Sequence, residues 1–432
     1  MPITTAVVMA AGEGRRLRPL TRYRPKPLLP AANRPLLEYV LDSLVDAGVD
    51  EIHLVVGYRR DRVQEHVGSS YRGADVDYHV QEKQLGSGHA LLQAAPGIDG
   101  GFLAVNGDQI VDPAMVRDVR EAHGDAIATL GVIESERAAN YGVVELEGDR
   151  VVDVTERPSD EPHGHLLNAG VYAFMPDVFR AIEETPPVDG ERGIPDTIGR
   201  LVEADEYVRG VRTAGTWVDA TYPWDLLTVA AELLAAGRVD EPELGAGGAG
   251  GEGGADGEGG ADDEAGGARG DDRGGLARAP DGVYVAESAR VHPSSVLRGP
   301  VVVGTDAVIG PGAVVGPDTA LGRGVRVGAN AVVEASVLDA DTAVDANATV
   351  VDCVTGEAAE LGAGSVVPGG PGDVRVEATV HEATPLGGLV ADRATVAGGA
   401  VVAPGTLIGP EARVGVGCLA RGSVPEAADV TR

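Results

Sequence analysis

Short apolar runs alternate with amphipathic stretches along the first 235 residues. Strands are predicted at residues 3–9, 51–56, 77–80, 102–105, 126–132, 143–144 and 151–154. Helices are predicted at residues 36–47, 61–67, 90–95 and 226–236. Strands that alternate with helices are typical of a mostly parallel sheet covered on both faces. We therefore predict an α/β, Rossmann-like domain over residues 1–238.

A second pattern, with a period of six residues, begins near residue 281. Aliphatic residues occupy every sixth position from Val285 to Val333, and a glycine often follows, as at Gly304. The same phase returns from Val390 to Val414. Such a period predicts one flat face of a triangular coil per repeat, with the aliphatic side chains stacked inside. We expect this coil to occupy residues 281–432.

Residues 239–280 lie between the two patterns and consist mainly of Gly, Ala, Asp and Glu. A segment with almost no large apolar side chains cannot bury enough surface to offset the entropy of ordering it. We therefore predict a disordered linker that separates two independent units.

The formal net charge of −32 argues against nucleic acid or an anionic membrane as the main partner, because both attract basic surfaces. The acidity is general, and the chain has 33 arginines but only two lysines. This composition favours a protein that stays hydrated in high salt, and we expect a salt-loving archaeal host. No apolar run approaches the roughly 20 residues of a membrane span, so we expect a cytoplasmic protein. The two cysteines, Cys353 and Cys418, are expected to be reduced and buried.

The first predicted strand ends in a glycine-containing loop, Ala11-Gly12-Glu13-Gly14. Glycines allow a ligand to approach backbone N–H groups closely, so the loop suits a polyphosphate. Two better-known phosphate loops do not fit, because neither Gly-Lys-Ser/Thr nor a third glycine follows Gly14. Downstream, Lys26 stands between two prolines that restrict the local backbone. A lysine held in this way is a candidate for phosphate chemistry.

Two later strands also end in polar segments. Gln81 and the pair Gly86-Ser87 follow the strand at 77–80, and Asp108 follows the strand at 102–105. Ligands of α/β sheets bind where strands end, so these segments should face the same crevice as the glycine loop. On composition alone, Asp108 could equally be a helix N-cap.

The sequence GEGRRLRPLT, followed by RPKPLLP, resembles the signature of the sugar-1-phosphate nucleotidyltransferases. These enzymes join a nucleoside triphosphate to a sugar 1-phosphate and release pyrophosphate. The resemblance implies that Arg15 and Lys26 are catalytic, and that Ala11, Gly12 and Gly14 bind the nucleotide.

The segment QEKQLGSGHAL is similar to the base-recognition loop of uridylyltransferases that act on N-acetylglucosamine 1-phosphate. This likeness implies that Gln81, Gly86 and Ser87 recognise uracil. Family position also implies Mg²⁺ on Asp108 and Asp219, although many relatives have glycine where Thr221 follows. The pieces YGVV, ERP and NAGVY imply sugar-phosphate contacts from Gly142, Glu156, Arg157 and Asn168. Arg157 replaces a lysine of many relatives and can still bind phosphate.

The six-residue repeat is similar to the left-handed β-helix of hexapeptide acyltransferases, which implies a homotrimer. The complete layout resembles the archaeal bifunctional enzymes that acetylate glucosamine 1-phosphate with acetyl-CoA and then uridylylate it. However, the stretch 344–354 lacks the histidine base of the acetyltransferases, and residues 368–373 lack their asparagine and basic residues. His381 could replace the base, with a surface-loop histidine as the alternative. The second activity is therefore doubtful.

Three hypotheses follow. The first is a uridylyltransferase that takes UTP with N-acetylglucosamine 1-phosphate or glucose 1-phosphate. The second is a thymidylyltransferase or guanylyltransferase acting on another hexose phosphate, with the β-helix as a structural trimerising unit. The third is a non-enzymatic nucleotide sensor on a trimeric scaffold, against which the retained Lys26, Asp108 and Asp219 argue.

Overall fold

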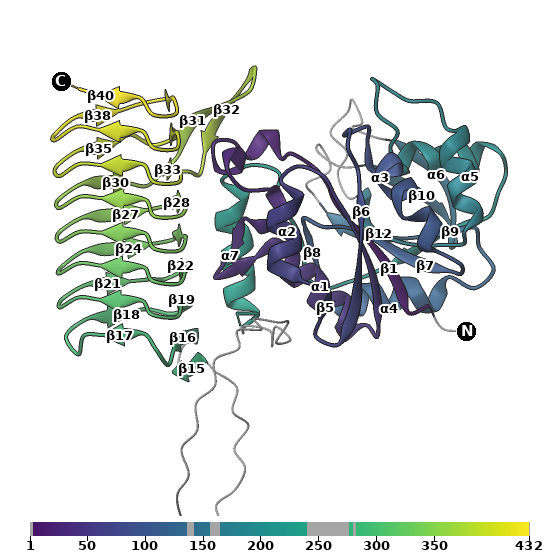
Figure 1. Ribbon diagram of the computed structural model, residues 1–432, viewed down its shortest axis with the longest axis horizontal. Helices are drawn as coiled ribbons and strands as arrows, with labels where there is room; N and C mark the ends of the chain where they lie inside the picture. Colours follow the sequence, from purple (N-terminus) through teal and green to yellow (C-terminus); the bar gives the residue numbers. More distant parts are fainter. Residues whose placement is uncertain (1–2, 136–141, 156–164, 240–275, 280–281, 432) are drawn as a thin grey trace, which may run out of the picture.

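The computed structural model describes residues 3–135, 142–155, 165–239, 276–279 and 282–431. An α/β unit and a column of stacked parallel strands stand side by side, with helix α7 (Asp225–Ala235) between them (Figure 1). Within these residues no helix is long and apolar enough to cross a membrane.

A ten-stranded sheet forms the centre of the α/β unit. Its order is β10 (Val143–Glu147), β11 (Arg150–Thr155), β13 (Val208–Arg212), β9 (Ala128–Ser135), β12 (His165–Phe174), β7 (Phe102–Asn106), β1 (Thr5–Ala10), β4 (Glu51–Val56), β6 (Ala74–Val80) and β5 (Ser70–Tyr71). β1 pairs in parallel with β4 and β7, and β4 pairs in parallel with β6. β12 runs antiparallel to both β7 and β9, so the predicted parallel arrangement holds mainly for the half that carries the glycine loop.

Helices cover both faces of this sheet. They are α1 (Leu36–Asp46), α2 (Arg60–Val67), α3 (Ser87–Ala94), α4 (Pro113–Ala122), α5 (Asp177–Glu184) and α6 (Ile194–Glu203). Alternate residues of β1 enter two different cores, because Val8 packs with residues of α1 and α4 while Val7 packs with residues of α3, α5 and α6. Because both faces of β1 are buried, its sequence is a continuous apolar run.

Three sheets of mostly parallel strands form the coil. One sheet contains β15 (Leu276–Ala279), β16 (Val283–Ala286), β19 (Val301–Val303), β22 (Thr319–Leu321), β25 (Val337–Leu338), β28 (Cys353–Thr355), β33 (Gly388–Val390), β36 (Thr406–Ile408) and β39 (Ser423–Val424). A second contains β17 (Arg290–Val291), β20 (Val308–Ile309), β23 (Arg326–Val327), β26 (Ala343–Val344), β29 (Glu360–Leu361), β34 (Thr395–Val396), β37 (Arg413–Val414) and β40 (Asp429–Val430). The third contains β18 (Val296–Leu297), β21 (Val314–Val315), β24 (Val332–Glu334), β27 (Thr349–Val351), β30 (Val366–Pro368), β35 (Val401–Val402) and β38 (Leu419–Ala420).

The register of these sheets confirms a parallel β-helix. Val301 lies opposite Thr319, so one turn of three strands takes 18 residues, and the aliphatic residues from Val303 to Val333 fill the interior. Farther along, Ala320 lies opposite Val337, which makes the turn 17 residues long. The shorter turns and an inserted hairpin, β31 (Gly372–Val376) with β32 (Thr379–Thr384), explain why the period of six lapses between residues 334 and 389.

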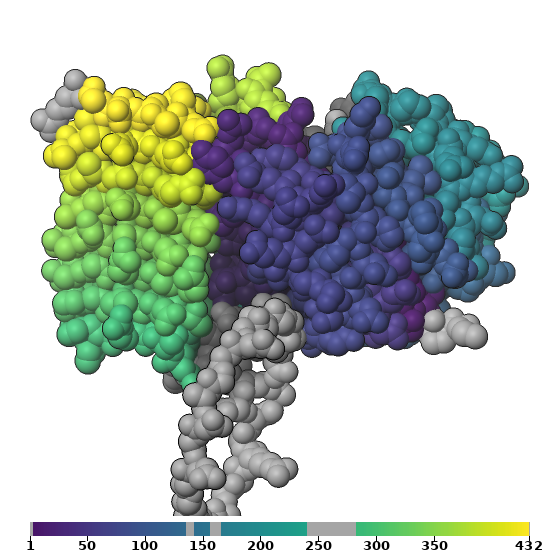
Figure 2. Space-filling model, viewed as in Figure 1, coloured from purple at the N-terminus to yellow at the C-terminus, as the bar shows by residue number. Residues whose placement is uncertain are grey.

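The α/β unit and the coil share a hydrophobic core. Leu226, Val229 and Leu233 of α7 pack in one cluster with outward-facing residues of the coil such as Val302 and Val337. In the space-filling view, atoms from the first part of the chain, drawn in purple, lie directly against the C-terminal turns of the coil (Figure 2). The expectation of two independent units is therefore wrong, because each covers an apolar face of the other.

Both ends of the predicted linker are ordered. Val239 is fully buried, and β15 pairs antiparallel with β16. The rest of the predicted linker, residues 240–275 and 280, lies outside the described residues. Cys353 and Cys418 are free and buried, as expected, and burial raises the pKa of the Cys353 thiol to about 12.

Candidate active site

The glycine loop and the lysine segment pack against each other. Gly14 has a φ of +65°, and a Cβ there would lie 2.9 Å from Cβ of Lys26. The hydroxyl of Thr21 donates a hydrogen bond of 2.8 Å to the Gly14 carbonyl. Only glycine permits both the left-handed backbone and this close approach. At Gly12 a Cβ would meet nothing within 4 Å, so the loop backbone there is open to a ligand.

Lys26 lies between two aspartates. Its Nζ is 2.5 Å from Oδ2 of Asp108 and 3.8 Å from Oδ1 of Asp219. Asp108 directly precedes β8 (Gln109–Val111), and Asp219 ends β14 (Trp217–Asp219). These two strands pair antiparallel with Asp219 opposite Gln109, which places the carboxylates together. The structure thus joins three of the residues selected from the sequence.

The buried charges of Lys26 and Asp219 affect each other's pKa. Burial alone would lower the pKa of Lys26, but the carboxylates of Asp108 and Asp219 outweigh it and raise that pKa. Burial raises the pKa of Asp219, and repulsion by Asp108 adds to the shift although Lys26 opposes it. Two carboxylates in such a position attract a cation and phosphate groups that share it.

A turn after β14 fixes Asp219. The Thr221 hydroxyl donates to Oδ2 of Asp219 at 2.6 Å. Oδ2 of Asp225 accepts from the backbone N–H groups of Thr221 and Tyr222 at 2.9 and 2.7 Å, and burial raises the pKa of Asp225 to about 6. Thr221 therefore orients the aspartate. The sequence pattern did not single out Thr221 or Asp225 for this supporting role.

The segment after β6 is held in a defined conformation. Nε2 of Gln81 donates to the Gly86 carbonyl at 3.1 Å and lies 2.9 Å from Nδ1 of His89. With Nδ1 as an acceptor, both amide N–H groups are used, and the amide oxygen is left to accept from a ligand. Burial and the charge of Arg192 lower the pKa of His89, which suits a neutral acceptor.

The glycine and serine of this segment are anchored from the opposite side. Gly86 has a φ of +96°, and a Cβ there would collide with the carbonyl of Arg192. Oγ of Ser87 accepts from the backbone N–H of Ile194 at 3.0 Å. The segment that contains Gly86 and Ser87 is therefore held in place beside the glycine loop. Gln84 of the same segment donates a hydrogen bond of 3.2 Å to the Ala11 carbonyl of the glycine loop.

Comparison with known proteins agrees with this geometry. The sequence profile described as Nucleotidyl transferase matches residues 5–236. The chain belongs to the nucleotidyl transferase family. A second profile, described as GMPPB C-terminal domain, matches residues 297–382 of the coil.

Three relatives are similar in sequence to about half of this nucleotidyl transferase. It is 34% identical over 226 residues to a protein named Bifunctional protein GlmU from Methanococcus maripaludis, covering 52% of this chain and 53% of the relative. It is 35% identical over 225 residues to UTP--glucose-1-phosphate uridylyltransferase AglF from Haloferax volcanii, covering 51% of this chain and 92% of the relative. It is 35% identical over 227 residues to Low-salt glycan biosynthesis nucleotidyltransferase Agl11 from Haloferax volcanii, covering 51% and 63%. The chain spans about half the length of the GlmU relative.

The two arginines of the glycine loop have different surroundings in this nucleotidyl transferase. Nε of Arg15 lies 2.7 Å from Oε2 of Glu13, and the exposed Arg15 side chain lines an open cavity of about 440 Å³ beside the coil. Arg16 instead lies over the ring of Tyr222, 5.9 Å from its centroid, and its charge opposes the raised pKa of both Lys26 and Asp219. Arg16, which follows the glycine loop in the sequence, therefore acts electrostatically on both Lys26 and Asp219.

The structure describes Gly142 and Asn168 but not the other residues predicted to bind the sugar phosphate. The backbone N–H of Asn168 donates to the Gly142 carbonyl at 2.9 Å, so the structure brings these two residues together. The Asn168 side chain donates to the Tyr172 hydroxyl at 2.9 Å and accepts from the Gly170 N–H at 3.1 Å. Glu156 and Arg157 lie outside the described residues.

The coil holds the segment that carries Lys26. Arg24 is buried and forms ion pairs with Asp339 and Asp392 of the coil, the latter at 3.0 Å from Nη2. Burial alone would lower the pKa of Arg24, but these carboxylates outweigh it and raise that pKa. Only Pro25 separates Arg24 from Lys26, so the coil fixes the backbone that positions the lysine.

The inserted hairpin also reaches the nucleotidyl transferase unit. His381 lies on β32, with its ring centroid 4.7 Å from that of Tyr222 and 5.1 Å from that of Trp224. The alternative of a surface-loop histidine is therefore wrong. His381 packs against the aromatic pair that follows Asp219, so the hairpin joins the coil to the candidate active site.

Proposed function

We propose that the α/β unit transfers the uridylyl group of UTP to N-acetylglucosamine 1-phosphate or glucose 1-phosphate, giving a UDP-sugar and pyrophosphate. The observation that carries the proposal is Lys26 held between Asp108 and Asp219 beside an open glycine loop. The names of two relatives, a GlmU protein and a UTP--glucose-1-phosphate uridylyltransferase, support the choice of nucleotide and sugars.

Asp108 and Asp219 are the residues that would hold Mg²⁺. Their donors fit, because a hard cation prefers carboxylate oxygens and a few phosphate oxygens. Burial raises the pKa of Asp219 and repulsion by Asp108 adds to the shift, and a nearby divalent cation would favour the charged carboxylates. When bound, Mg²⁺ supplies charge neutralisation at the phosphate oxygens.

The side chains and backbone perform the remaining tasks. A sugar 1-phosphate is largely dianionic at neutral pH, because its second pKa is about 6, so its attack on the α-phosphorus needs no general base. One of its oxygens forms the new bond to the α-phosphorus, and the bond to the leaving pyrophosphate breaks. The Ala11–Gly14 loop holds the triphosphate, and Lys26 with Arg15 and Arg16 neutralises the charge that develops.

Base and sugar are bound on either side of this centre. The amide oxygen of Gln81 accepts from N3–H of uracil, while Gly86 and Ser87 shape the wall of the base pocket. Gly142, Glu156, Arg157 and Asn168 bind the sugar and its phosphate. The contact between Gly142 and Asn168 supports this grouping.

We expect Gln81→Leu to raise the KM for UTP about 10- to 100-fold and to weaken the preference for UTP over GTP. The substitution removes the hydrogen bond to the base from a buried residue, which costs about 1–3 kcal/mol. Steady-state kinetics with both nucleotides measure the change. Gln93→Leu is the matched control, because Gln93 donates to the backbone of α3 and should leave selectivity intact. Unchanged selectivity in Gln81→Leu would remove this assignment.

Pyrophosphate release tests the activity itself. Purified protein in high salt with Mg²⁺ is assayed with UTP, dTTP and GTP against a panel of sugar 1-phosphates. We expect turnover with UTP and N-acetylglucosamine 1-phosphate or glucose 1-phosphate. A preference for dTTP or GTP would instead support the thymidylyltransferase or guanylyltransferase alternative, and nucleotide binding without turnover would support the sensor.

The coil acts in this proposal as a scaffold that forms a homotrimer, and the enzyme works in the cytoplasm. We expect no thiol release from acetyl-CoA with glucosamine 1-phosphate, because the stretch 344–354 lacks a histidine and His381 packs against Tyr222 and Trp224. A thiol-detection assay measures this. Thiol release that survives His381→Ala would show an acetyltransferase site elsewhere on the coil.

A further inference from the structure

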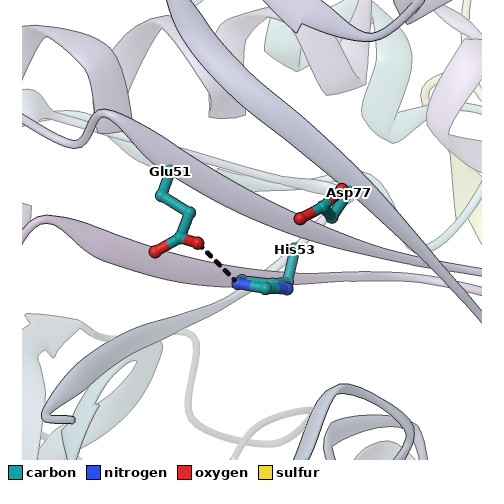
Figure 3. Close-up of side chains that lie close together, drawn as sticks. All are labelled: Glu51, His53 and Asp77. Atoms are coloured by element: carbon teal, nitrogen blue, oxygen red, sulfur yellow. Dashed lines mark ion pairs between the residues drawn. The ribbon is translucent and has the colours of Figure 1, made fainter. Parts of the chain in front are cut away.

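We propose a second cation site in the α/β unit, formed by Glu51, His53 and Asp77, that binds a divalent transition metal such as Zn²⁺. The three side chains come from the neighbouring parallel strands β4 and β6 and point toward one another (Figure 3). This site lies apart from the Lys26 cluster and does not depend on the proposed activity.

The spacing of the ligand atoms suits one ion. One donor atom from each residue lies within 4.8 Å of the others, and Nε2 of His53 is 3.5 Å from Oε1 of Glu51. Two ligands of a tetrahedral zinc ion, each about 2.0–2.2 Å from the metal, are about 3.4 Å apart. The histidine and Glu51 thus already have the separation of two ligands, and Asp77 needs only a small side-chain movement to join them.

The buried histidine nitrogen supplies the second, independent observation. The His53 side chain is only 3% exposed, and apart from the 3.5 Å contact with Glu51 its Nε2 has no hydrogen-bond partner among the described residues. A buried polar atom without a hydrogen bond is unfavourable. An ion coordinated by Nε2 and the two carboxylates satisfies all three groups at once.

Supporting contacts orient two of the ligands. Nδ1 of His53 lies 2.8 Å from Nε2 of His79, and the Thr5 hydroxyl donates to Oε2 of Glu51 at 2.8 Å. Metal-binding histidines are commonly oriented through the ring nitrogen that does not bind the ion. Gly97 lies against the histidine pair, because a Cβ there would be 2.8 Å from Cε1 of His53.

The donor set and its position define the kind of ion and its role. One imidazole and two carboxylates favour Zn²⁺, Co²⁺ or Mn²⁺ over Mg²⁺, and exposed Asp77 leaves an entry path and room for water. Glu51 begins β4, whereas the candidate active site lies at the opposite, carboxyl ends of the strands, about 16 Å away along the strand. The ion would therefore join β4 to β6 rather than take part in phosphate chemistry.

Cobalt binding to the full chain tests the site. Chelator-treated protein in high salt is titrated with Co²⁺, then with Zn²⁺, and followed by visible ligand-field absorption and thermal unfolding. We expect visible bands from one bound ion, their loss on addition of Zn²⁺, and a higher Tm with Zn²⁺. We expect His53→Gln and Asp77→Asn to weaken Co²⁺ binding about 100-fold.

Two controls separate this site from the other acidic residues. His66→Gln removes a histidine that contacts Glu38 instead, and the double variant Asp108→Asn/Asp219→Asn removes the other carboxylate pair. Both should keep the bands. Asp77 is exposed, so Asp77→Asn should fold even if His53→Gln does not. Absence of the bands in the original chain, or their persistence in Asp77→Asn, would overturn the proposal.

Discussion

Lys26→Met is expected to lower kcat for nucleotidyl transfer by about 10²- to 10³-fold, with little change in overall fold. Nζ of Lys26 lies 2.5 Å from Oδ2 of Asp108, and in the proposed mechanism its positive charge stabilises the phosphate charge that develops during transfer. The methionine side chain keeps much of the length of the lysine but removes its charge and hydrogen bonds. Pyrophosphate release at saturating UTP and sugar 1-phosphate measures the loss.

The chain provides a matched control in Lys83, its other lysine. Lys83 is exposed, and we expect Lys83→Met to keep most of the activity. Thermal unfolding with and without Mg²⁺ adds a second readout, because Lys26→Met leaves Asp108 and Asp219 without their shared counter-charge. Mg²⁺ should stabilise this variant more than it stabilises the original chain. Retention of most of the turnover in Lys26→Met would exclude a catalytic role for this residue.

Arg24→Met is expected to reduce the free energy of unfolding by about 3–5 kcal/mol. The substitution leaves Asp339 and Asp392 buried without their positive partner, and the exposed fractions of these side chains are only 11% and 5%. It also releases the backbone next to Lys26, so kcat should fall even at temperatures at which the variant is folded. Chemical denaturation measures the stability, and pyrophosphate release at low temperature measures kcat.

Two comparisons separate charge from position in this prediction. The triple variant Arg24→Met/Asp339→Asn/Asp392→Asn removes all three charges and should recover much of the stability, because no buried carboxylate is left unpaired. Arg22→Met removes an arginine that is 51% exposed and paired with Glu426, and it should change stability by less than about 1 kcal/mol. Equal stability of Arg24→Met and the original chain would show that the coil does not hold this segment.

Local patterns predicted some elements of the α/β unit closely and missed others. The strand predicted at 51–56 coincides with β4, and the helix predicted at 36–47 is α1 with one residue less. Helices α4, α5 and α6 were not predicted, although Asp112 is an N-cap that accepts from the Ala114 N–H and Pro113 follows it. Ile194, Ile198 and Leu201 of α6 are buried and have helical spacing, so the signal was present in the apolar spacing as well as in the cap.

Contacts between distant segments were beyond the reach of the sequence. Lys26, Asp108 and Asp219 were selected because family resemblance marks them, and the pairing of β8 with β14 brings the two aspartates together. No motif marks Arg24, whose partner Asp392 lies 368 residues away. His53 and Asp77 meet only because the register of β4 and β6 places them side by side. The outward-facing Val302 looked like another strand residue until α7 was seen to cover it.

The ion pair between Arg24 and Asp392 also constrains the order in which the protein matures. Synthesis proceeds from the N-terminus and domains tend to fold as they emerge, so the α/β unit leaves the ribosome long before its carboxylate partners exist. The lysine segment of the nascent chain therefore lacks its anchor until Asp339, and then Asp392, of the coil have been made. A product that terminates before residue 392 would retain every residue proposed to bind UTP and the sugar phosphate, yet lack one half of the anchor beside Lys26.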